Sequence, residues 1–117
     1  MPLLRSFGFA FAGVGYLLRT QRNFRIEVVI GAGAIGAGMF ARFAPWEWAV
    51  LVLTIAMVLI LEAVNTAIEN AVTLASPSFN PRARAAKDVS AAAVLIAALA
   101  SVAVGVALFG PRLLAAG

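Results

Sequence analysis

Residues 58–73 read VLILEAVNTAIENAVT and place two carboxylates, Glu62 and Glu69, in a run that is otherwise apolar enough to lie in a membrane. The apolar run extends over residues 46–74, and a helix needs about 20 residues to span roughly 30 Å of hydrocarbon. We therefore expect a membrane-spanning helix over 46–74. Its glutamates set the functional question, because an ionised carboxylate in hydrocarbon costs about 2.5 to 3.5 kcal/mol on insertion scales and is rarely incidental.

The composition as a whole is that of an integral membrane protein. Of the 117 residues, 63% are hydrophobic and 12% are charged, whereas soluble domains carry about 25% charged residues. Residues 1–117 form one domain, too small to enclose a deep site alone, so we expect a homo-oligomer whose sites are shared between subunits. Cys and His are absent, which excludes thiolate nucleophiles, disulfides and histidine proton shuttles. Carboxylates, amides, Lys and Arg must carry any chemistry.

Two further apolar stretches, residues 26–42 and 81–109, complete a predicted all-α membrane fold with three spans. The first is short for a span and is rich in small residues, which let helices approach closely; Ala34/Gly38 is one of its small-xxx-small pairs. Residues 31–36, GAGAIG, match the dinucleotide pattern G-x-G-x-x-G. A dinucleotide site needs a strand before the glycines and a buried parallel sheet, and the sequence predicts no strands. We therefore favour a role of these glycines in helix packing.

The N-terminal stretch, residues 3–22, is interrupted by Gly and cationic at its end, so we expect an amphipathic helix in the membrane interface. Alternating phenylalanines in residues 7–11 would also suit a strand, but an isolated strand leaves its backbone groups unpaired in a membrane. A signal peptide is the other alternative, since Arg5 precedes apolar residues. No polar-to-small cleavage region follows before Arg19, which argues against it.

Positive charges predict the orientation. By the positive-inside rule, the N-terminus and the loop between the second and third spans are cytoplasmic and the C-terminus is outside, as for a bacterial plasma (inner) membrane protein. Asn80 and Pro81 suit an N-cap and a first helical position at the cytoplasmic start of the third helix. The basic face would attract lipid headgroups and nucleotide phosphates, and no nucleic acid is expected. The expected cytoplasmic charges are Arg5, Arg19, Arg22, Arg25, Arg82, Arg84 and Lys87, against Arg42 and Arg112 outside.

Glu62, Asn65 and Glu69 fall at i, i+3 and i+7 and form one polar stripe on the second span. At a rise of about 1.5 Å per residue, Glu69 lies about 6 Å below a cytoplasmic end near Thr73, and Glu62 about 16 Å below it. Glu69 is therefore placed to meet ions and phosphates from water. Glu62 is placed to meet something dissolved in the membrane.

Three interpretations of the stripe stay open on spacing alone. Together with Lys87 and Asp88 it could bind a metal, carry a polyphosphate and deprotonate a hydroxyl. In a purely structural reading, Glu62 and Asn65 join helices by hydrogen bonds and Lys87 pairs with Asp88. In a third, the protein is a proton-coupled transporter or exporter with Glu62 as a carboxylate relay.

Two motifs, EAVNTAIENAV at 62–72 and RAAKDVSAAAVL at 84–95, resemble the signature of the prokaryotic diacylglycerol kinase family, a group of small membrane lipid kinases, and stand at the family's separation. RSFGFAFAGVGYLLRTQRNFRIE at 5–27 resembles the family's start, so the likeness covers nearly the whole chain. The resemblance implies a homotrimer with shared active sites, each subunit having an interfacial helix and three membrane helices. It also implies transfer of the ATP γ-phosphate to a lipid alcohol with Mg²⁺.

The resemblance further implies roles for individual residues. Glu62 would be the general base for the lipid hydroxyl, and Asn65 would orient the carboxylate or the hydroxyl. Glu69 would hold the magnesium that bridges the ATP phosphates, and Lys87 would neutralise phosphate charge. The remaining matches are Ser78, Phe79, Asn80 and Asp88 at nucleotide-site positions, and Arg25, Glu27 and Ala91, with Glu62, at positions facing the lipid cleft.

This chain departs from the family pattern at three positions. Gln21 stands where a second metal-binding glutamate is usual, Thr73 where an aspartate is usual, and Asn80 where one common version has a histidine. The Gln21 amide can coordinate magnesium and bind with Glu69 at the nucleotide phosphates, but it adds no charge. Either Glu27 or Asp88 compensates, or metal affinity is lower, and a catalytically impaired family member is an alternative.

A single stretch of sequence bears on the choice between the two possible lipid substrates. RNFRIE at 22–27 looks closer to RNFRIH-type members, many of which act on undecaprenol. Undecaprenol is therefore favoured over diacylglycerol, although both present a primary hydroxyl on a long apolar body.

Overall fold

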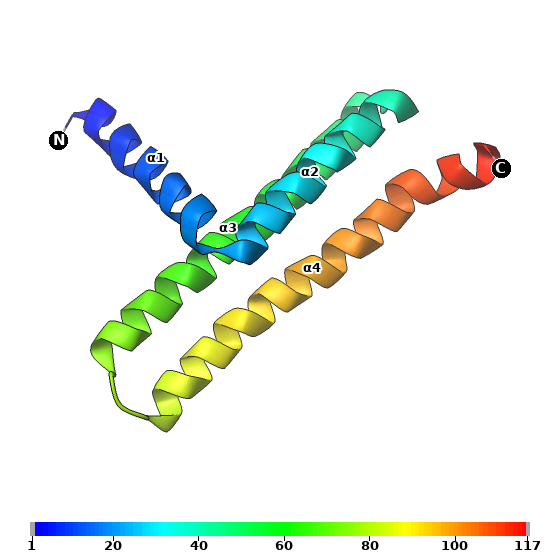
Figure 1. The fold of residues 1–117 in the computed structure, drawn as a ribbon. Helices are drawn as coiled ribbons and strands as arrows, with labels where there is room; N and C mark the ends of the chain where they lie inside the picture. Colours follow the sequence, from blue (N-terminus) through cyan, green and yellow to red (C-terminus); the bar gives the residue numbers. More distant parts are fainter. Residues whose placement is uncertain (1, 117) are drawn as a thin grey trace.

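The computed structural model describes residues 2–116, and every regular element in that range is a helix. The four helices are α1 (Leu3–Thr20), α2 (Arg22–Ala41), α3 (Pro45–Ala75) and α4 (Pro81–Ala116). Figure 1 shows α2, α3 and α4 running along one another, while α1 leaves this bundle at an angle. The predicted all-α architecture is confirmed.

Helices α2, α3 and α4 are each long and apolar enough to cross a membrane. In the 18-residue apolar stretch of each helix, only 17%, 22% and 11% of the residues, respectively, are buried within the chain. Apolar side chains at the surface of a soluble protein would be a liability, whereas a bilayer solvates them. The chain is thus a membrane protein that hides little of its own apolar surface.

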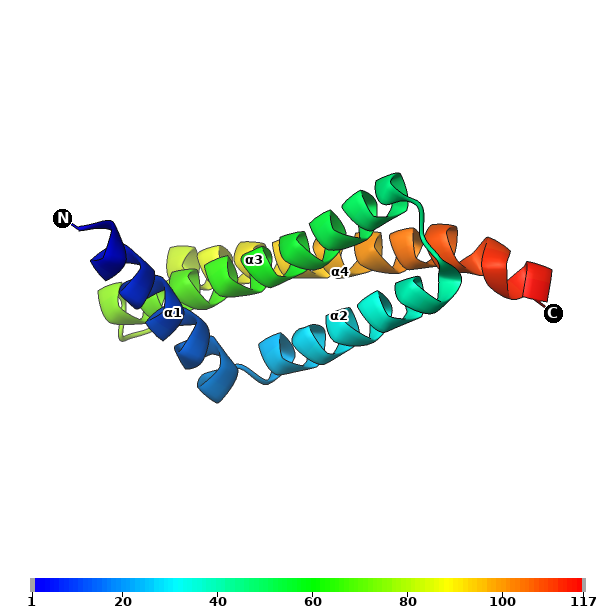
Figure 2. The same cartoon turned by 90° about the horizontal axis from the view of Figure 1, so that it is seen from above.

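Helix α3 holds the bundle together. It packs along α4 over much of its length and against α2 over a shorter one, and α1 contacts the start of α2. In the view of Figure 2, α3 and α4 overlap along most of their length while α2 runs below them. Any site that draws on several helices is consequently organised around α3.

The turn between α2 and α3 is tightly packed. Arg42 ends α2 in the left-handed conformation at φ 54°, and the Phe43 amide donates to the carbonyl of Gly38 at 3.2 Å. A Cβ at Gly38 would lie 2.9 Å from the Trp48 ring and 3.0 Å from the Phe43 ring, so any larger residue would force a ring to move. Gly33 meets nothing within 4 Å. The predicted small-residue contact between helices is therefore made by the Gly38 face of α2, and the Gly33 face is open.

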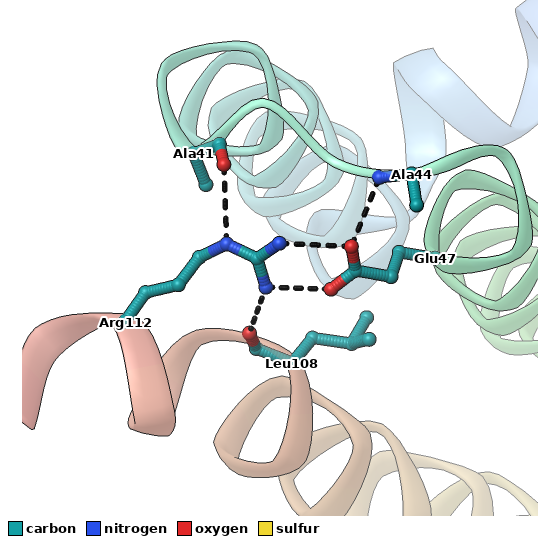
Figure 3. A network of polar contacts seen from close by, with 5 residues as sticks. All are labelled: Ala41, Ala44, Glu47, Leu108 and Arg112. Carbon is teal, nitrogen blue, oxygen red and sulfur yellow. Dashed lines mark hydrogen bonds and ion pairs between the residues drawn. The ribbon is translucent and has the colours of Figure 1, made fainter. Parts of the chain in front are cut away.

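An ion pair fastens the same end of the bundle (Figure 3). The Arg112 guanidinium on α4 donates to both carboxylate oxygens of Glu47 on α3, at 2.5 and 2.8 Å. It also donates to the carbonyls of Ala41 and Leu108, each at 3.1 Å, and Glu47 accepts the Ala44 amide at 2.9 Å. The network joins the end of α2, the start of α3 and the end of α4. The charge pattern of the sequence predicts Arg112 only as an outside charge, and nothing in it predicts a role for Glu47.

Three helix boundaries differ by two or more residues from the expected ranges. Helix α2, expected over 26–42, already begins at Arg22. The N-terminal helix, expected over 3–22, ends at Thr20 because Gln21 is extended at φ −112° and ψ 105°. The last helix, expected to end at 109, continues through Pro111 to Ala116. Its extra turns, about two at 3.6 residues each, carry Arg112, whose bonds to the α2–α3 corner hold that part of the chain against the bundle.

Candidate active site

The polar stripe lies on α3 as the helical spacing predicts. Glu62 and Thr66 are buried at 6% and 5% exposure, while Asn65 and Glu69 are half-buried. The Thr66 hydroxyl donates to the main-chain carbonyl of Glu62 at 3.0 Å, so it is used within its own helix. The Glu62 carboxylate accepts no hydrogen bond from the residues between 2 and 116. A buried carboxylate of this kind has its oxygens available to a substrate.

Acidic groups from two helices surround Glu62. Glu27 on α2 and Glu69 on α3 are close enough for their negative charges to act on its carboxylate. Glu27 also lies at the edge of a cavity of about 210 Å³ between α2, α3 and α4, whose remaining lining is mostly apolar. The expected lipid-facing residues Glu27 and Glu62 therefore share one electrostatic neighbourhood.

Asn65 connects the stripe to α4 through a serine that sequence analysis missed. The buried Ser90 hydroxyl donates to Oδ1 of Asn65 at 2.7 Å, and Nδ2 of Asn65 donates to a Glu69 carboxylate oxygen at 3.4 Å. Ser90 stands three residues after Lys87, on the same face of α4. The spacing of three residues from Lys87 is the sequence feature that could have placed Ser90 near the site.

A polar hollow of about 280 Å³ lies where the α3–α4 loop meets the start of α4. Figure 1 shows this loop at the end of the bundle opposite to the α2–α3 turn. Asn80 caps α4 there, as expected, by accepting the amides of Arg82 and Ala83 at 2.8 and 3.4 Å. Lys87 reaches across to donate to the Thr73 hydroxyl at 2.9 Å. Of the expected nucleotide-site residues, this hollow brings together Ser78, Phe79, Asn80 and Lys87.

Other expected site residues bond elsewhere. Asp88 pairs with Arg84 at 3.2 Å on the exposed surface, and not with Lys87. Arg25 donates to the carbonyls of Leu18 and Arg19 at 2.9 and 3.2 Å, which caps the end of α1. The Gln21 amide donates to the Thr20 hydroxyl at 3.2 Å, and Ala91 is exposed on α4.

Helix α1 is tied to α3 by a contact that no local pattern could reveal. Asn70 donates to the Tyr16 hydroxyl at 3.1 Å, across a sequence separation of 54 residues. The pair lies beside a groove between the two helices. Asn70 follows Glu69 directly, so α1 is fastened next to the half-buried end of the stripe.

The residues at this end fit a magnesium ion carried by a phosphate. No cluster of three or more Asp, Glu, His or Cys side chains able to hold a metal occurs in residues 2–116. Magnesium bound with a nucleotide needs only one or two carboxylates, because phosphates and water supply its other ligands. One oxygen of the Glu69 carboxylate is bonded to Asn65, and the other accepts no hydrogen bond from the described residues, which suits such a ligand.

Comparison with known proteins identifies the family. The model of the family described as prokaryotic diacylglycerol kinase matches residues 8–109. The chain belongs to this family. The match contains α2 and α3 whole, together with the polar stripe and the hollow at the α3–α4 loop.

Curated relatives of this prokaryotic diacylglycerol kinase family member carry two names. The chain is 47% identical over 113 residues to a diacylglycerol kinase of Synechocystis sp., covering 96% of this chain and 65% of that protein. It is 35% identical over 109 residues to an undecaprenol kinase of Bacillus subtilis, covering 93% and 89%. A Helicobacter pylori diacylglycerol kinase is 38% identical over 76 residues, covering 65% and 59%. Both names are those of lipid kinases.

Proposed function

We propose that the chain is a membrane lipid kinase that transfers the γ-phosphate of ATP to the primary hydroxyl of a lipid alcohol, with Mg²⁺ as cofactor. One observation carries the proposal. The buried carboxylate of Glu62, which has no hydrogen-bond donor among the described residues, shares a helix face with Glu69, which lies toward the polar end of the bundle. The family match over residues 8–109 supports it.

Glu62 acts as the general base in this proposal. Its carboxylate accepts no hydrogen bond within residues 2–116, so it is available to a substrate hydroxyl. Taking the proton as the hydroxyl oxygen attacks phosphorus makes the alcohol a better nucleophile. Because Glu62 is only 6% exposed, bulk water has little access to compete for the phosphoryl group there. Asn65, one turn along α3, bonds Glu69 and Ser90 rather than Glu62, and would act in this proposal on the substrate hydroxyl.

Glu69 and Lys87 handle the phosphates. Glu69 lies about 10 Å from Glu62 along the helix axis at about 1.5 Å per residue, toward the hollow at the α3–α4 loop. When bound, Mg²⁺ supplies charge neutralisation and alignment of the phosphate oxygens, and Glu69, with Gln21, would hold it. Lys87 lines the hollow and offers a cation at its wall. Ser78, Phe79 and Asn80 line the same hollow and would bind the nucleotide. Asp88, next to Lys87 in sequence, would contribute to nucleotide binding as well.

The lipid substrate enters from the membrane. Glu27 beside Glu62, together with Arg25 and Ala91, would face it. RNFRIE at 22–27 favours undecaprenol, while the relatives are named for both alcohols. We propose undecaprenol as the preferred substrate and diacylglycerol as the competitor.

Assembly and placement follow the same proposal. The chain forms a homotrimer in the bacterial plasma (inner) membrane, with α1 in the interface, the N-terminus and α3–α4 loop cytoplasmic, and the C-terminus outside. The largely exposed apolar faces of α2 and α4 support contacts with neighbouring subunits as well as lipid. A neighbouring helix would close each site, which explains how so small a chain can shield its reaction from water.

One assay tests the proposed function. The purified protein is incubated with γ-labelled ATP and either undecaprenol or diacylglycerol, with and without magnesium. We expect label on the lipid only when magnesium is present, and faster with undecaprenol. Absence of lipid labelling under every condition would reject kinase activity for this chain. The departures at Gln21 and Thr73 would then mark it as an inactive family member. Proton-coupled transport would then be the function to test.

A further inference from the structure

We propose that Ser90 is a positioning residue that fixes the Asn65 amide and, through it, the Glu69 carboxylate. This inference rests on the proposed function, because Glu69 is there the ligand of the nucleotide-bound metal. Ser90 lies on α4 and is 6% exposed, whereas Asn65 and Glu69 lie on α3. The hydroxyl thus links the second membrane-spanning helix to the third at the site.

The direction of the hydrogen bonds is determined by chemistry. An ionised carboxylate only accepts hydrogen bonds, so Asn65 must turn its NH₂ group toward Glu69, where the contact is 3.4 Å. Its Oδ1 then faces Ser90 and needs a donor. The Ser90 hydroxyl supplies it at 2.7 Å, a shorter contact than its 3.0 Å approach to the Lys87 carbonyl. One proton on Ser90 therefore selects the amide orientation that supports Glu69.

Loss of this hydroxyl has a specific consequence. With Ser90 buried, water has little access to replace the lost donor, and Oδ1 of Asn65 is left without its partner. The amide is then free to rotate and present its oxygen to Glu69, which repels the carboxylate. A metal ligand needs its carboxylate held in place by such outer contacts, whose removal typically costs 10- to 100-fold in metal affinity.

The chain contains a matched control on the same helix. Ser101 donates to the carbonyl of Ala98 at 2.7 Å, three residues earlier, just as Ser90 approaches the carbonyl of Lys87. Ser101 makes no hydrogen bond to another helix within residues 2–116. Replacing either serine by alanine removes the same group from α4, but only Ser90→Ala removes a contact to Asn65.

The primary experiment measures metal binding directly. Mn²⁺ and a non-hydrolysable ATP analogue are titrated into the full-length protein, and bound Mn²⁺ is followed by electron paramagnetic resonance. We expect Ser90→Ala to weaken Mn²⁺ binding about tenfold, Ser101→Ala to match wild type, and Ser90→Thr, which keeps the hydroxyl, to restore binding. Lipid KM in the labelled-ATP assay should be unchanged in Ser90→Ala, while the magnesium needed for half-maximal rate rises.

A double-mutant cycle separates positioning from general damage. Because Ser90 acts through Asn65, Ser90→Ala should add no further loss of Mn²⁺ binding in an Asn65→Ala background. Equal binding by wild type and Ser90→Ala, equal losses in both serine variants, or a full further loss in the Asn65→Ala background would overturn the inference. If Ser90→Ala does not fold, Ser90→Cys, a weaker donor, is measured instead and should fall between alanine and threonine. Failure of the proposed function is distinct, since wild type would then label neither lipid.

Discussion

Gly38 offers a test of the packed corner that holds α2 against α3. A methyl group there would lie 2.9 Å from the Trp48 ring and 3.0 Å from the Phe43 ring, against about 3.5 to 4.0 Å for a comfortable carbon contact. One ring must therefore move, and overpacking of this kind costs about 1 to 3 kcal/mol. Gly38→Ala also gains about 0.5 to 1 kcal/mol from the better helix former. The net expectation is a destabilisation of about 1 kcal/mol.

Gly33→Ala on the same helix is the matched control. A methyl group there meets nothing within 4 Å, so the substitution gains the same helix propensity without the clash. The difference in unfolding free energy between the two variants isolates the packing cost, expected at about 1 to 3 kcal/mol. It is measured by equilibrium unfolding in mixed detergent micelles containing increasing fractions of a denaturing detergent. Equal stability of Gly38→Ala and Gly33→Ala would refute the close approach of α2 to the corner.

Two further predictions concern the nucleotide end of the site. Lys87→Ala should raise the KM for ATP about tenfold without changing the KM for lipid, because a charge-assisted contact is lost. The control is Arg82→Ala, which removes an exposed charge at the start of α4. Equal losses for ATP and lipid in Lys87→Ala would argue that Lys87 is structural. Gln21→Glu should lower the magnesium needed for half-maximal activity, because a charged oxygen replaces a neutral amide. Asn23→Asp is its control, and an unchanged titration in Gln21→Glu would leave Glu69 as the metal ligand.

The fold was largely predictable because the membrane makes the hydrophobic signal long and simple. Three apolar runs gave three helices, and the Asn80 cap was found from local sequence since capping is a local interaction. The boundary at Gln21 was missed because its extended backbone depends on Arg25 bonding back to α1. The helix past Pro111 was missed for a similar reason, the long-range anchoring of Arg112.

The site was predictable where its members share one helix. The spacing of Glu62, Asn65 and Glu69 fixes their common face regardless of the rest of the chain. Contacts between helices carry no such periodic signal. The Ser90–Asn65 and Tyr16–Asn70 contacts depend on how α4 and α1 rotate against α3, which only packing decides.

The partner of Lys87 is another contact that the sequence alone does not determine. One of the open interpretations paired Lys87 with its sequence neighbour Asp88, yet neighbouring residues on a helix point in different directions. In the structure Asp88 meets Arg84, one turn back, while Lys87 turns toward Thr73 on α3. The charge inventory was identified correctly, and the pairing required the fold.

The most direct test of the account is phosphoryl transfer by Glu62→Gln. The amide preserves the shape of the side chain and removes its ability to accept the substrate proton. It also removes a charge from a buried position, so the protein should fold and resist denaturation at least as well as wild type. With γ-labelled ATP, magnesium and undecaprenol, the account expects a loss of at least about 10²-fold in kcat with ATP binding retained. Near-normal turnover by a folded Glu62→Gln protein would contradict it.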